Sequence, residues 1–528
     1  MMDGQRRCSR VRTGDVVVRG RRIGLLAVVV WFMHSNVIML QAAGTTARSA
    51  AVERRAEQLR AAHRELFRRY AQTAREIAEQ ARTNGAVALE RLVRSRIVPP
   101  SEAPGGGVML PRKVAETNGT DVPPSAADLL IRWRANEKRY AADVYLLSRR
   151  ALRADLPVYA YRLVQETLFH DPDHAAARRV MGFVRVGDEW LTPFAARMRR
   201  EGKVWHDRFG WIPEKYVARY EAGERLTPRG WMTAAQEAAW RQDFRNGWVI
   251  ETEHFRVKTN HSLEQGVHVA RTLETFHAHL HRLLAGFFLS PEQLEAIFSG
   301  KAGQRLRYDP HEVYLFRSRQ EYIDRLKARV PQIAISNGLY MSEDRRSYFF
   351  FRQDADLPLE TTLFHEATHQ LLYECDRRPR PIAEDAHFWV IEGIACYMES
   401  FRPAAREPVF GDPQYIRFRA ARYRLEREGY YLPLAELDRL GRRAFHEHPN
   451  IRENYSQASG LVHYFMHYDG GRFRDALIAH LIDLYHQDPR RPRRVRGLDE
   501  LTGVSFAEHD RLYKAYILTL GETGDGGS

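Results

Sequence analysis

The sequence predicts an α+β protein, in which a mostly helical N-terminal half precedes a domain that combines strands with further helices. Two observations predict this class. Apolar residues recur with helical spacing over 52–98 and 125–186, and again over 263–288. Residues 252–259 instead alternate between polar and apolar side chains, which is typical of a half-buried strand. A length of 528 residues with 44% hydrophobic content indicates more than one domain, with ample material for a packed core.

Residues 1–44 are predicted to be an export signal or a signal anchor. An Arg-rich start ends at Arg21-Arg22, an apolar run follows from Ile23 to Met33, and small residues appear from Ala42 onward. The apolar stretch could extend to Leu40, which leaves an uncleaved N-terminal membrane anchor as the alternative to a cleaved signal. In both cases we expect the bulk of the protein outside the cytoplasm, either periplasmic or secreted.

Residues 45–98 read as a long helix or weak coiled coil, either a spacer or oligomerisation element or simply a solvated helix. Residues 99–124, rich in Pro and Gly, are a linker. Residues 125–186 form a helical module, and the run 169–178 is similar to the turn of a tetratricopeptide-type repeat. Only one such unit is visible. We therefore expect a small module that packs by default and could dock a protein partner.

Residues 187–249 are a Trp-rich region. Trp190, Trp211, Trp231 and Trp248 recur at spacings of 21, 20 and 17 residues, which is a tendency rather than a true repeat. Short strands or turns with aromatic anchors are expected here, separated by helices such as 233–244. These aromatic residues either fill a small core, which is the commoner case, or bind an extended polymer such as a glycan or peptide.

The net charge of +14 says little about partners. Residues 1–22 contain seven Arg and two Asp, so this segment supplies +5 and leaves +9 for the rest. The remaining Arg residues are scattered along helices without a basic stripe, and we expect no nucleic-acid binding. Two of the three cysteines, Cys375 and Cys396, flank the motif described below. They either pair in an oxidising compartment or are two small buried side chains, and neither is assigned as a metal ligand.

Residues 250–520 form the last predicted domain, followed by a tail at 521–528. Its expected elements after the first strand are a helix over 263–288, a strand over 313–316, a helix over 319–328, a hairpin that joins 338–341 to 348–351, and helices over 454–468 and 472–519.

The strongest signal lies in the helical run Leu363–Gln370, which contains His-Glu-x-x-His. Positions four apart share one face of a helix, so His365 and His369 can offer two imidazoles to the same ion. Glu366 is better placed to hold a water than to bind a metal. Two imidazoles and a nearby carboxylate suit a catalytic zinc, provided that a third protein ligand exists.

Glu392 is the candidate for the third ligand. It lies 23 residues beyond His369, inside the apolar helical run Phe388–Tyr397. A lone carboxylate in such a run would be costly to bury without a partner, and a zinc ion is such a partner. Gly393 and Ala395 are small, so we expect this helix to approach the first one closely.

The pattern His-Glu-x-x-His followed by Glu-Gly-x-Ala-x-Tyr resembles the gluzincin metallopeptidases, and within them an uncharacterised bacterial peptidase-MA-like family. The resemblance covers about 251 to the C-terminus. It implies a thermolysin-like domain with a small mixed sheet above the metal helix and a helical lower subdomain. It also implies a Zn²⁺ cofactor held by His365, His369 and Glu392, with Glu366 as general base and then acid.

The resemblance further implies peptide or protein substrates that pair with a strand edge. The strand nearest in sequence to the metal helix, with Tyr348, Phe349, Phe350 and Phe351, is the candidate edge. Tyr455 is a candidate donor to the developing oxyanion, and His463 is a weaker one. A zinc hydrolase of a non-peptide amide or ester, and a non-catalytic envelope scaffold that binds a partner, remain alternatives. No anchor for a free amino terminus is visible, which favours endopeptidase action.

Overall fold

The computed structural model describes residues 24–99, 110–114, 123–300, 309–352, 358–375, 381–403, 409–488, 490 and 493–521. The chain divides into two compact units, residues 1–60 and 61–528. The Arg-rich start of the predicted export signal, most of the predicted linker and nearly all of the predicted tail lie outside the described residues. Within the described residues, no helix combines the length and the apolar character that crossing a bilayer requires.

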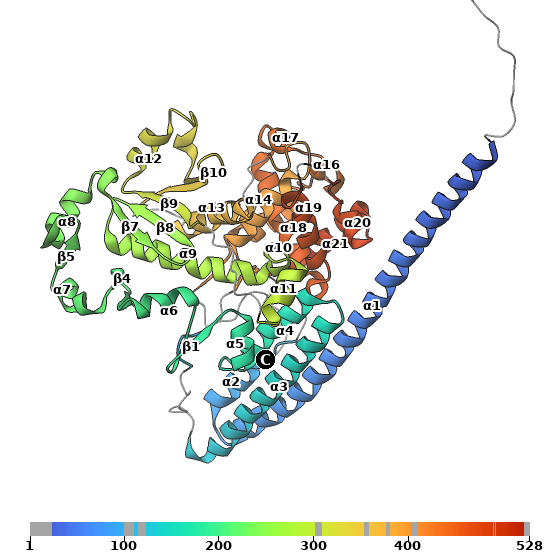
Figure 1. The fold of residues 1–528 in the computed structure, drawn as a ribbon, viewed down its shortest axis with the longest axis horizontal. Coiled ribbons are helices and arrows are strands. Elements are labelled where there is room, and N and C mark those ends of the chain that lie inside the picture. The colour runs from blue at the N-terminus through green and yellow to red at the C-terminus, as the bar shows by residue number, and fades with distance from the viewer. Residues whose placement is uncertain are drawn as a thin grey trace, which may run out of the picture. The chain divides into compact units, whose positions relative to one another are not determined.

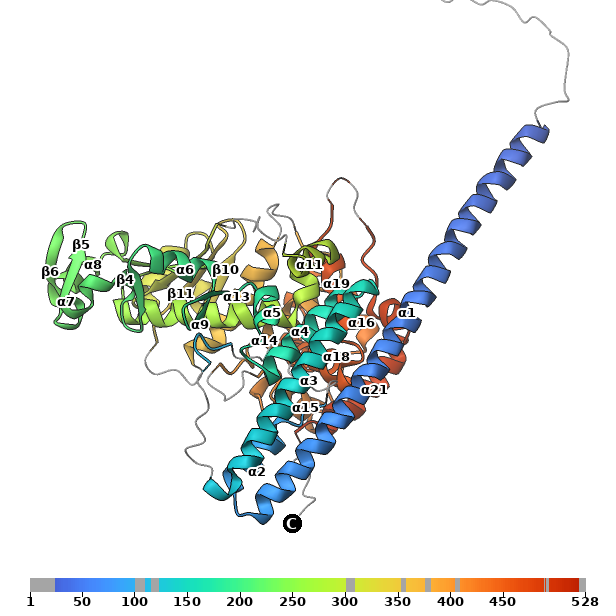
Figure 2. The same ribbon diagram turned by 60° about the horizontal axis from the view of Figure 1, so that its bottom comes forward.

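The N-terminal half is mostly helical, as predicted. Its helices are α1 Gly24–Thr83, α2 Val87–Arg96, α3 Ala127–Arg153, α4 Pro157–His170 and α5 Ala175–Val180. The expected single helix over 45–98 is interrupted where Gly85 adopts a φ of 70°, a backbone conformation that glycine reaches without steric cost. Helices α3 and α4 lie side by side (Figures 1 and 2) and bury an apolar face between them.

The Trp-rich region consists of three antiparallel hairpins, each followed by a helix. The strand pairs are β1 Val184–Val186 with β2 Glu189–Leu191, β3 Lys203–His206 with β4 Gly210–Pro213, and β5 Glu224–Thr227 with β6 Gly230–Thr233. The helices are α6 Pro193–Arg200, α7 Val217–Glu221 and α8 Ala234–Arg241. Trp190, Trp211 and Trp231 occupy the second strand of each hairpin. The unit is therefore a true structural repeat, which the loose spacing had not indicated.

A five-stranded mixed sheet follows, in the order β10-β11-β9-β8-β7. Its strands are β7 Trp248–Glu251, β8 Phe255–Thr259, β9 His311–Phe316, β10 Gly338–Met341 and β11 Arg346–Phe350. The central pairs β8–β9 and β9–β11 are parallel, and the outer pairs β7–β8 and β10–β11 are antiparallel. The predicted hairpin that joins 338–341 to the next strand is confirmed.

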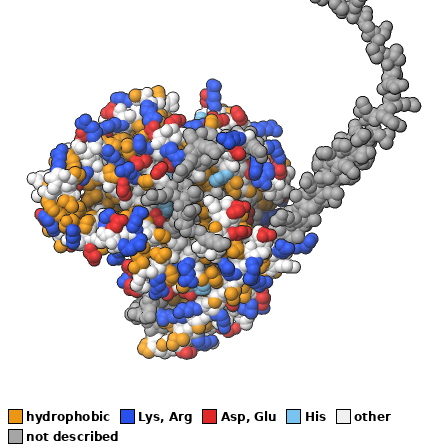
Figure 3. Space-filling model, viewed as in Figure 1, with side chains coloured by type: hydrophobic (Ala, Val, Ile, Leu, Met, Phe, Trp, Pro, Cys, Tyr) orange, Lys and Arg blue, Asp and Glu red, His pale blue; other side chains and the backbone are white. Residues whose placement is uncertain are grey.

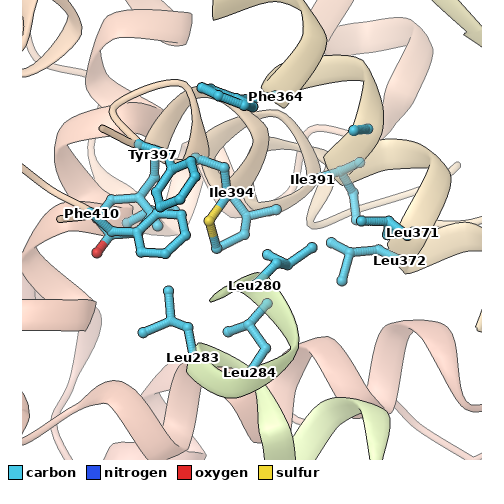
Figure 4. Close-up of a cluster of buried hydrophobic side chains, with 14 of the residues drawn as sticks. Leu280, Leu283, Leu284, Phe364, Leu371, Leu372, Ile391, Ile394, Tyr397 and Phe410 are labelled. Carbon is cyan, nitrogen blue, oxygen red and sulfur yellow. The ribbon is translucent and has the colours of Figure 1, made fainter. Parts of the chain in front are cut away.

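The helix α9 Leu263–Leu283 is capped by Ser262, whose hydroxyl accepts a hydrogen bond from the Gln265 amide, and it lies along the sheet (Figure 1). Beyond the sheet come α13 Leu359–Glu374 and α14 Phe388–Met398. Apolar side chains from α9, α13 and α14 meet in one core (Figure 4). Among them are Leu280, Phe364, Leu371 and Ile394. Each such buried side chain contributes about 1.5–3 kcal/mol, so this core fixes α13 against α14.

The C-terminal part is helical, as predicted. Its α-helices in the described residues are α15 Ile416–Arg427, α16 Leu434–Asp438, α17 Arg442–His446, α18 Ile451–Gly471, α19 Arg474–Tyr485, α20 Leu498–Thr502 and α21 Phe506–Thr519. Three further α-helices lie earlier, among the strands of the sheet, and are α10 Ala285–Phe288, α11 Pro291–Phe298 and α12 Arg319–Leu326. On the face seen in Figure 3, basic side chains are interspersed with acidic and apolar ones. The fold class is α+β, with a small mixed sheet and a helical C-terminal part.

Candidate metal centre

Two histidines on α13 turn the same ring atom toward one point. His365 and His369 lie four positions apart, and their Nε2 atoms are 3.1 Å from each other. Their side chains are 16% and 17% exposed, so solvent reaches the site. Two neutral imidazoles can satisfy such a contact only by sharing one proton, whereas an ion between them would satisfy both lone pairs.

Glu392 supplies a third ligand atom. Its Oε2 lies 3.6 Å from Nε2 of His365 and 3.7 Å from Nε2 of His369. A tetrahedral ion with bonds of about 2.1 Å holds its ligand atoms about 3.4 Å apart, which matches this triangle. Glu392 comes from α14, a helix buried along its whole length, where an uncompensated carboxylate would be strongly disfavoured. The three residues therefore fit a divalent cation.

A second carboxylate orients the first histidine. Glu399 Oε1 lies 2.8 Å from Nδ1 of His365, which makes Nδ1 the protonated nitrogen and leaves a lone pair on Nε2. Arg417 and Tyr415 donate to Glu399 in turn, Arg417 through two nitrogens at 2.9 Å each and Tyr415 through its hydroxyl at 2.8 Å. Burial opposes ionisation of Glu399, but His365 and Arg417 lower its pKa to about 2. Sequence reasoning missed Glu399, although its position seven residues after Glu392 places both on one helix face.

The charges at the site favour a cation. Burial raises the pKa of Glu392, but His365 and His369 outweigh it and hold that pKa well below its ordinary value. Burial alone would lower the pKa of His365, whereas Cys396, Glu392 and Glu399 raise it well above its ordinary value. The His365 imidazole thus lies in a negative environment created by Glu392 and Glu399, which a divalent ion would neutralise.

Glu366 points toward the sheet edge beside the cluster. Its Oε2 accepts a hydrogen bond of 2.8 Å from the Tyr340 amide, and Tyr340 belongs to β10. The prediction that Tyr348, Phe349, Phe350 and Phe351 form the substrate-facing edge is wrong. The first three lie in β11, which pairs with β10 on one side and β9 on the other, and Phe351 follows that strand. The strand that borders the metal helix at the sheet edge is β10.

Tyr455 on α18 reaches the cluster. Burial, the charges of Glu392 and Cys396, and a hydrogen bond with Glu392 raise the pKa of its hydroxyl, with a smaller contribution from Glu366. The hydroxyl therefore stays protonated and lies near the proposed ligand and the proposed base. Its ring packs edge-on against Phe445, with centroids 5.3 Å apart.

His463 does not join this group. It lies eight positions after Tyr455, about 12 Å along the helix axis. Its Nε2 donates to the Gly411 carbonyl at 2.9 Å, and its Nδ1 accepts from the Tyr516 hydroxyl at 2.7 Å. Both ring nitrogens are thus occupied by neutral partners in the core. The prediction of a catalytic role for His463 has no support in this geometry.

Three further details concern Gly393, for which the expectation was wrong, the two cysteines, whose pairing the sequence left open, and His446, which the sequence did not indicate. Gly393 brings α14 close to α18 rather than to α13, because a Cβ at this position would lie 2.8 Å from the Ala458 carbonyl oxygen. No disulfide joins Cys375 and Cys396. His446, at the end of α17, interacts electrostatically with Glu392 and His369. No sequence motif marks His446, since it follows Glu392 by 54 residues.

Residues 360–489 match the profile of the family DUF1570, described as a protein of unknown function. The matched segment contains the cluster of His365, His369 and Glu392, together with Glu399 and Tyr455. No curated protein matches the chain.

Proposed function

We propose that this protein is a zinc-dependent metallopeptidase of the gluzincin kind, which hydrolyses peptide bonds. The observation that carries the proposal is the convergence of two imidazole nitrogens and one carboxylate oxygen, all within 3.7 Å of one another, next to a fourth group, Glu366, on the same helix. The His-Glu-x-x-His and Glu-Gly-x-Ala-x-Tyr patterns that resemble gluzincins support the same reading.

Zinc is the proposed cofactor because a set of two histidines and one glutamate is typical of catalytic zinc sites that keep an open position. When bound, zinc would lower the pKa of a coordinated water toward about 7 and polarise a substrate carbonyl. His365 is held in the required tautomer by Glu399, and His369 and Glu392 complete the ligand set.

Glu366 is the proposed general base and acid. The Tyr340 amide occupies Oε2, which fixes the carboxylate in one orientation and leaves Oε1 to accept a proton from water. The same oxygen would then pass that proton to the leaving amine. A backbone amide holds Glu366 more rigidly than a side chain would, since β10 is part of the sheet.

Tyr455 and β10 are the proposed substrate contacts. The Tyr455 hydroxyl is protonated at neutral pH, as tyrosine ordinarily is, and it could donate to an oxyanion in place of its hydrogen bond with Glu392. Among the described strands β10 has a neighbouring strand on one side only. On its outer edge the Tyr340 amide donates to Glu366 and the Gly338 amide to the Ser336 hydroxyl, so an extended peptide would pair with the remaining groups of this edge. Such pairing favours peptide substrates over isolated esters or amides.

The N-terminal regions receive supporting roles in this proposal. The Arg-rich start and the apolar run 23–33 would direct export, so that the enzyme acts outside the cytoplasm. The helical module of α3, α4 and α5 would present a surface to a protein partner.

A peptide-library cleavage assay on the purified full-length chain tests the proposal. We expect cleavage by the wild type, loss of cleavage with a chelator, and recovery on addition of zinc. Glu366→Gln should retain zinc and lower kcat by about 10²–10⁴-fold, because general acid–base catalysis contributes that much.

Glu360→Gln is the matched control. Glu360 lies on the same helix but pairs with His268 at 3.0 Å, away from the ligands. This variant should keep wild-type cleavage and zinc content. Full zinc content without any peptide cleavage by the wild type would contradict the peptidase assignment, and an active Glu366→Gln variant would contradict the role of the base.

A further inference from the structure

We infer that the protein holds a second divalent metal ion, bound by His387, Asp438 and His480. These residues come from the start of α14, the end of α16 and the middle of α19. One ligand atom from each lies within 4.8 Å of the others. The cluster shares no residue with the candidate metal centre described above, and the inference does not depend on the proposed function.

The first observation is an unpaired nitrogen. His480 is fully buried, and its Nδ1 lies 2.7 Å from the Arg496 carbonyl oxygen. A carbonyl can only accept, so Nδ1 carries the proton and Nε2 carries a lone pair. Among the described residues Nε2 has no hydrogen-bond partner. Buried polar atoms are almost always paired, and histidines that bind metals typically donate their other nitrogen to a carbonyl or carboxylate, as His480 does.

The second observation is the carboxylate beside it. Asp438 is buried, and its Oδ1 lies 3.0 Å from Nδ1 of His387 and 2.9 Å from Nε1 of Trp389. The His387 and His480 rings meet edge to face, with centroids 5.0 Å apart. A tetrahedral ion with bonds of about 2.1 Å holds its ligand atoms about 3.4 Å apart. Since the three ligand atoms lie within 4.8 Å of one another, binding would require them to move together by about 1.4 Å at most.

The third observation is the backbone of His387. This residue adopts a φ of 64° and a ψ of 13°, a left-handed conformation that non-glycine residues rarely occupy. Its amide donates to the Asp438 carbonyl at 2.7 Å, so main chain and side chain of His387 are both tied to Asp438. Strained backbone persists where the surroundings over-determine it, and such positions cluster at functional and ligand sites.

Another histidine cluster of the molecule lacks these features. His254, Glu274 and His277 also lie close together, but Glu274 accepts from both the amide and the Nδ1 of His254. The rings of His254 and His277 stack face to face, with centroids 3.8 Å apart. Unlike His480, neither histidine of this cluster has a buried ring nitrogen without a hydrogen-bond partner among the described residues, so the cluster lacks the observation that indicates an ion.

The chemistry of the ligands indicates the class of ion. Two imidazoles and a carboxylate suit zinc or another first-row divalent metal rather than calcium or magnesium. The ion would connect α16 and α19 to the residue that precedes α14. Because Glu392 lies five positions after His387, in the helix that His387 precedes, this ion would fix the position of the helix that carries Glu392.

Zinc content of purified full-length protein, measured by mass spectrometry after dialysis against zinc, tests this inference. His480→Asn is the central variant, because the Asn amide can still donate to the Arg496 carbonyl while Nε2 is lost. We expect one zinc equivalent per chain fewer than in the wild type. His509→Asn is the matched control, since His509 is equally buried but has both nitrogens paired, with Tyr464 and Thr502. It should keep the wild-type content.

The double variant His365→Ala/His369→Ala tests this site separately from the proposed active site. Because it leaves His480 unchanged, it remains informative even if His480→Asn does not fold. It should retain one equivalent, and combining it with His480→Asn should leave none. If the proposed active site binds no zinc, the wild type itself holds one equivalent, which His480→Asn removes. Unchanged zinc content in a folded His480→Asn variant, or a double variant without zinc, would overturn the inference.

Discussion

Helices α13 and α18 each carry two histidines four positions apart, yet the two pairs do different things. On α13, the Nε2 atoms of His365 and His369 lie 3.1 Å apart and face Glu392. On α18, the rings of His463 and His467 stack, with centroids 4.5 Å apart and an interplanar angle of 29°. The two pairs have the same spacing, so spacing cannot explain the difference.

The hydrogen-bond and charge partners of the two histidine pairs explain the difference. The partners of the α18 pair are neutral, namely the Gly411 carbonyl and the Tyr516 hydroxyl for His463 and the Tyr397 hydroxyl for His467. The α13 pair has carboxylates instead, with Glu392 opposite the lone pairs and Glu399 behind His365. Neutral partners satisfy both nitrogens of a buried histidine, whereas carboxylates beside two converging lone pairs favour the binding of a cation.

The largest predicted difference between the two pairs is in metal binding. His365→Ala, His369→Ala and Glu392→Ala should each remove one equivalent of zinc per chain, because two remaining ligands hold an ion poorly. His463→Gln and His467→Gln, at the same helical spacing, should leave the zinc content unchanged. The measurement is zinc stoichiometry of the purified variants, with circular dichroism to verify folding. Normal zinc in all three α13–α14 variants would remove the distinction between the helices.

The next largest effect concerns the carboxylate behind His365. Glu399→Gln removes the charge that selects the His365 tautomer and pairs with Arg417. We expect zinc affinity to fall by about 10–100-fold, as is typical for partners of ligating histidines. Competition with a chromophoric chelator measures it. Glu360→Gln, which alters another carboxylate–histidine pair on α13, should bind zinc like the wild type. An affinity of Glu399→Gln equal to that of the control would mean that Glu399 only packs.

The sequence predicted much of this site because its main determinants are local. Helical spacing puts His365 and His369 on one face, and the cost of burying Glu392 in an apolar helix signals a partner. The edge strand was misassigned because β9, whose residues lie 34 positions before their partners in β11, pairs with β11 and moves it to the interior. No local pattern marks such a pairing.

Contacts between distant residues were equally invisible in the sequence. Glu399 was within reach of helical reasoning, since it shares a face with Glu392. In contrast, the contact between His387 and Asp438 joins positions 51 apart, and that between His463 and Tyr516 joins positions 53 apart. Whether a histidine is suited to be a ligand or a core residue depends on such contacts, so the resemblance gave His463 a role that its neighbours do not support.

The smallest predicted effect measures the neutral character of the α18 pair directly. Burial lowers the pKa of His463 to about 4, whereas a histidine in an unfolded chain has a pKa of about 6.5. Between these values the unfolded state binds more protons than the native state, so the free energy of unfolding falls as the pH falls from about 6.5 toward 4. From pH 7 to pH 5 the contribution of His463 to the loss of unfolding free energy is about 2 kcal/mol.

Urea unfolding at both pH values measures this contribution. His463→Gln removes the titrating group but can still donate to Gly411, so it should reduce the difference in unfolding free energy between the two pH values by that amount. If the variant shows the same difference in unfolding free energy between pH 7 and pH 5 as the wild type, the pKa of His463 is not lowered in the native state. The α18 pair would then not be a neutral core pair, and its contrast with the α13 pair would fail.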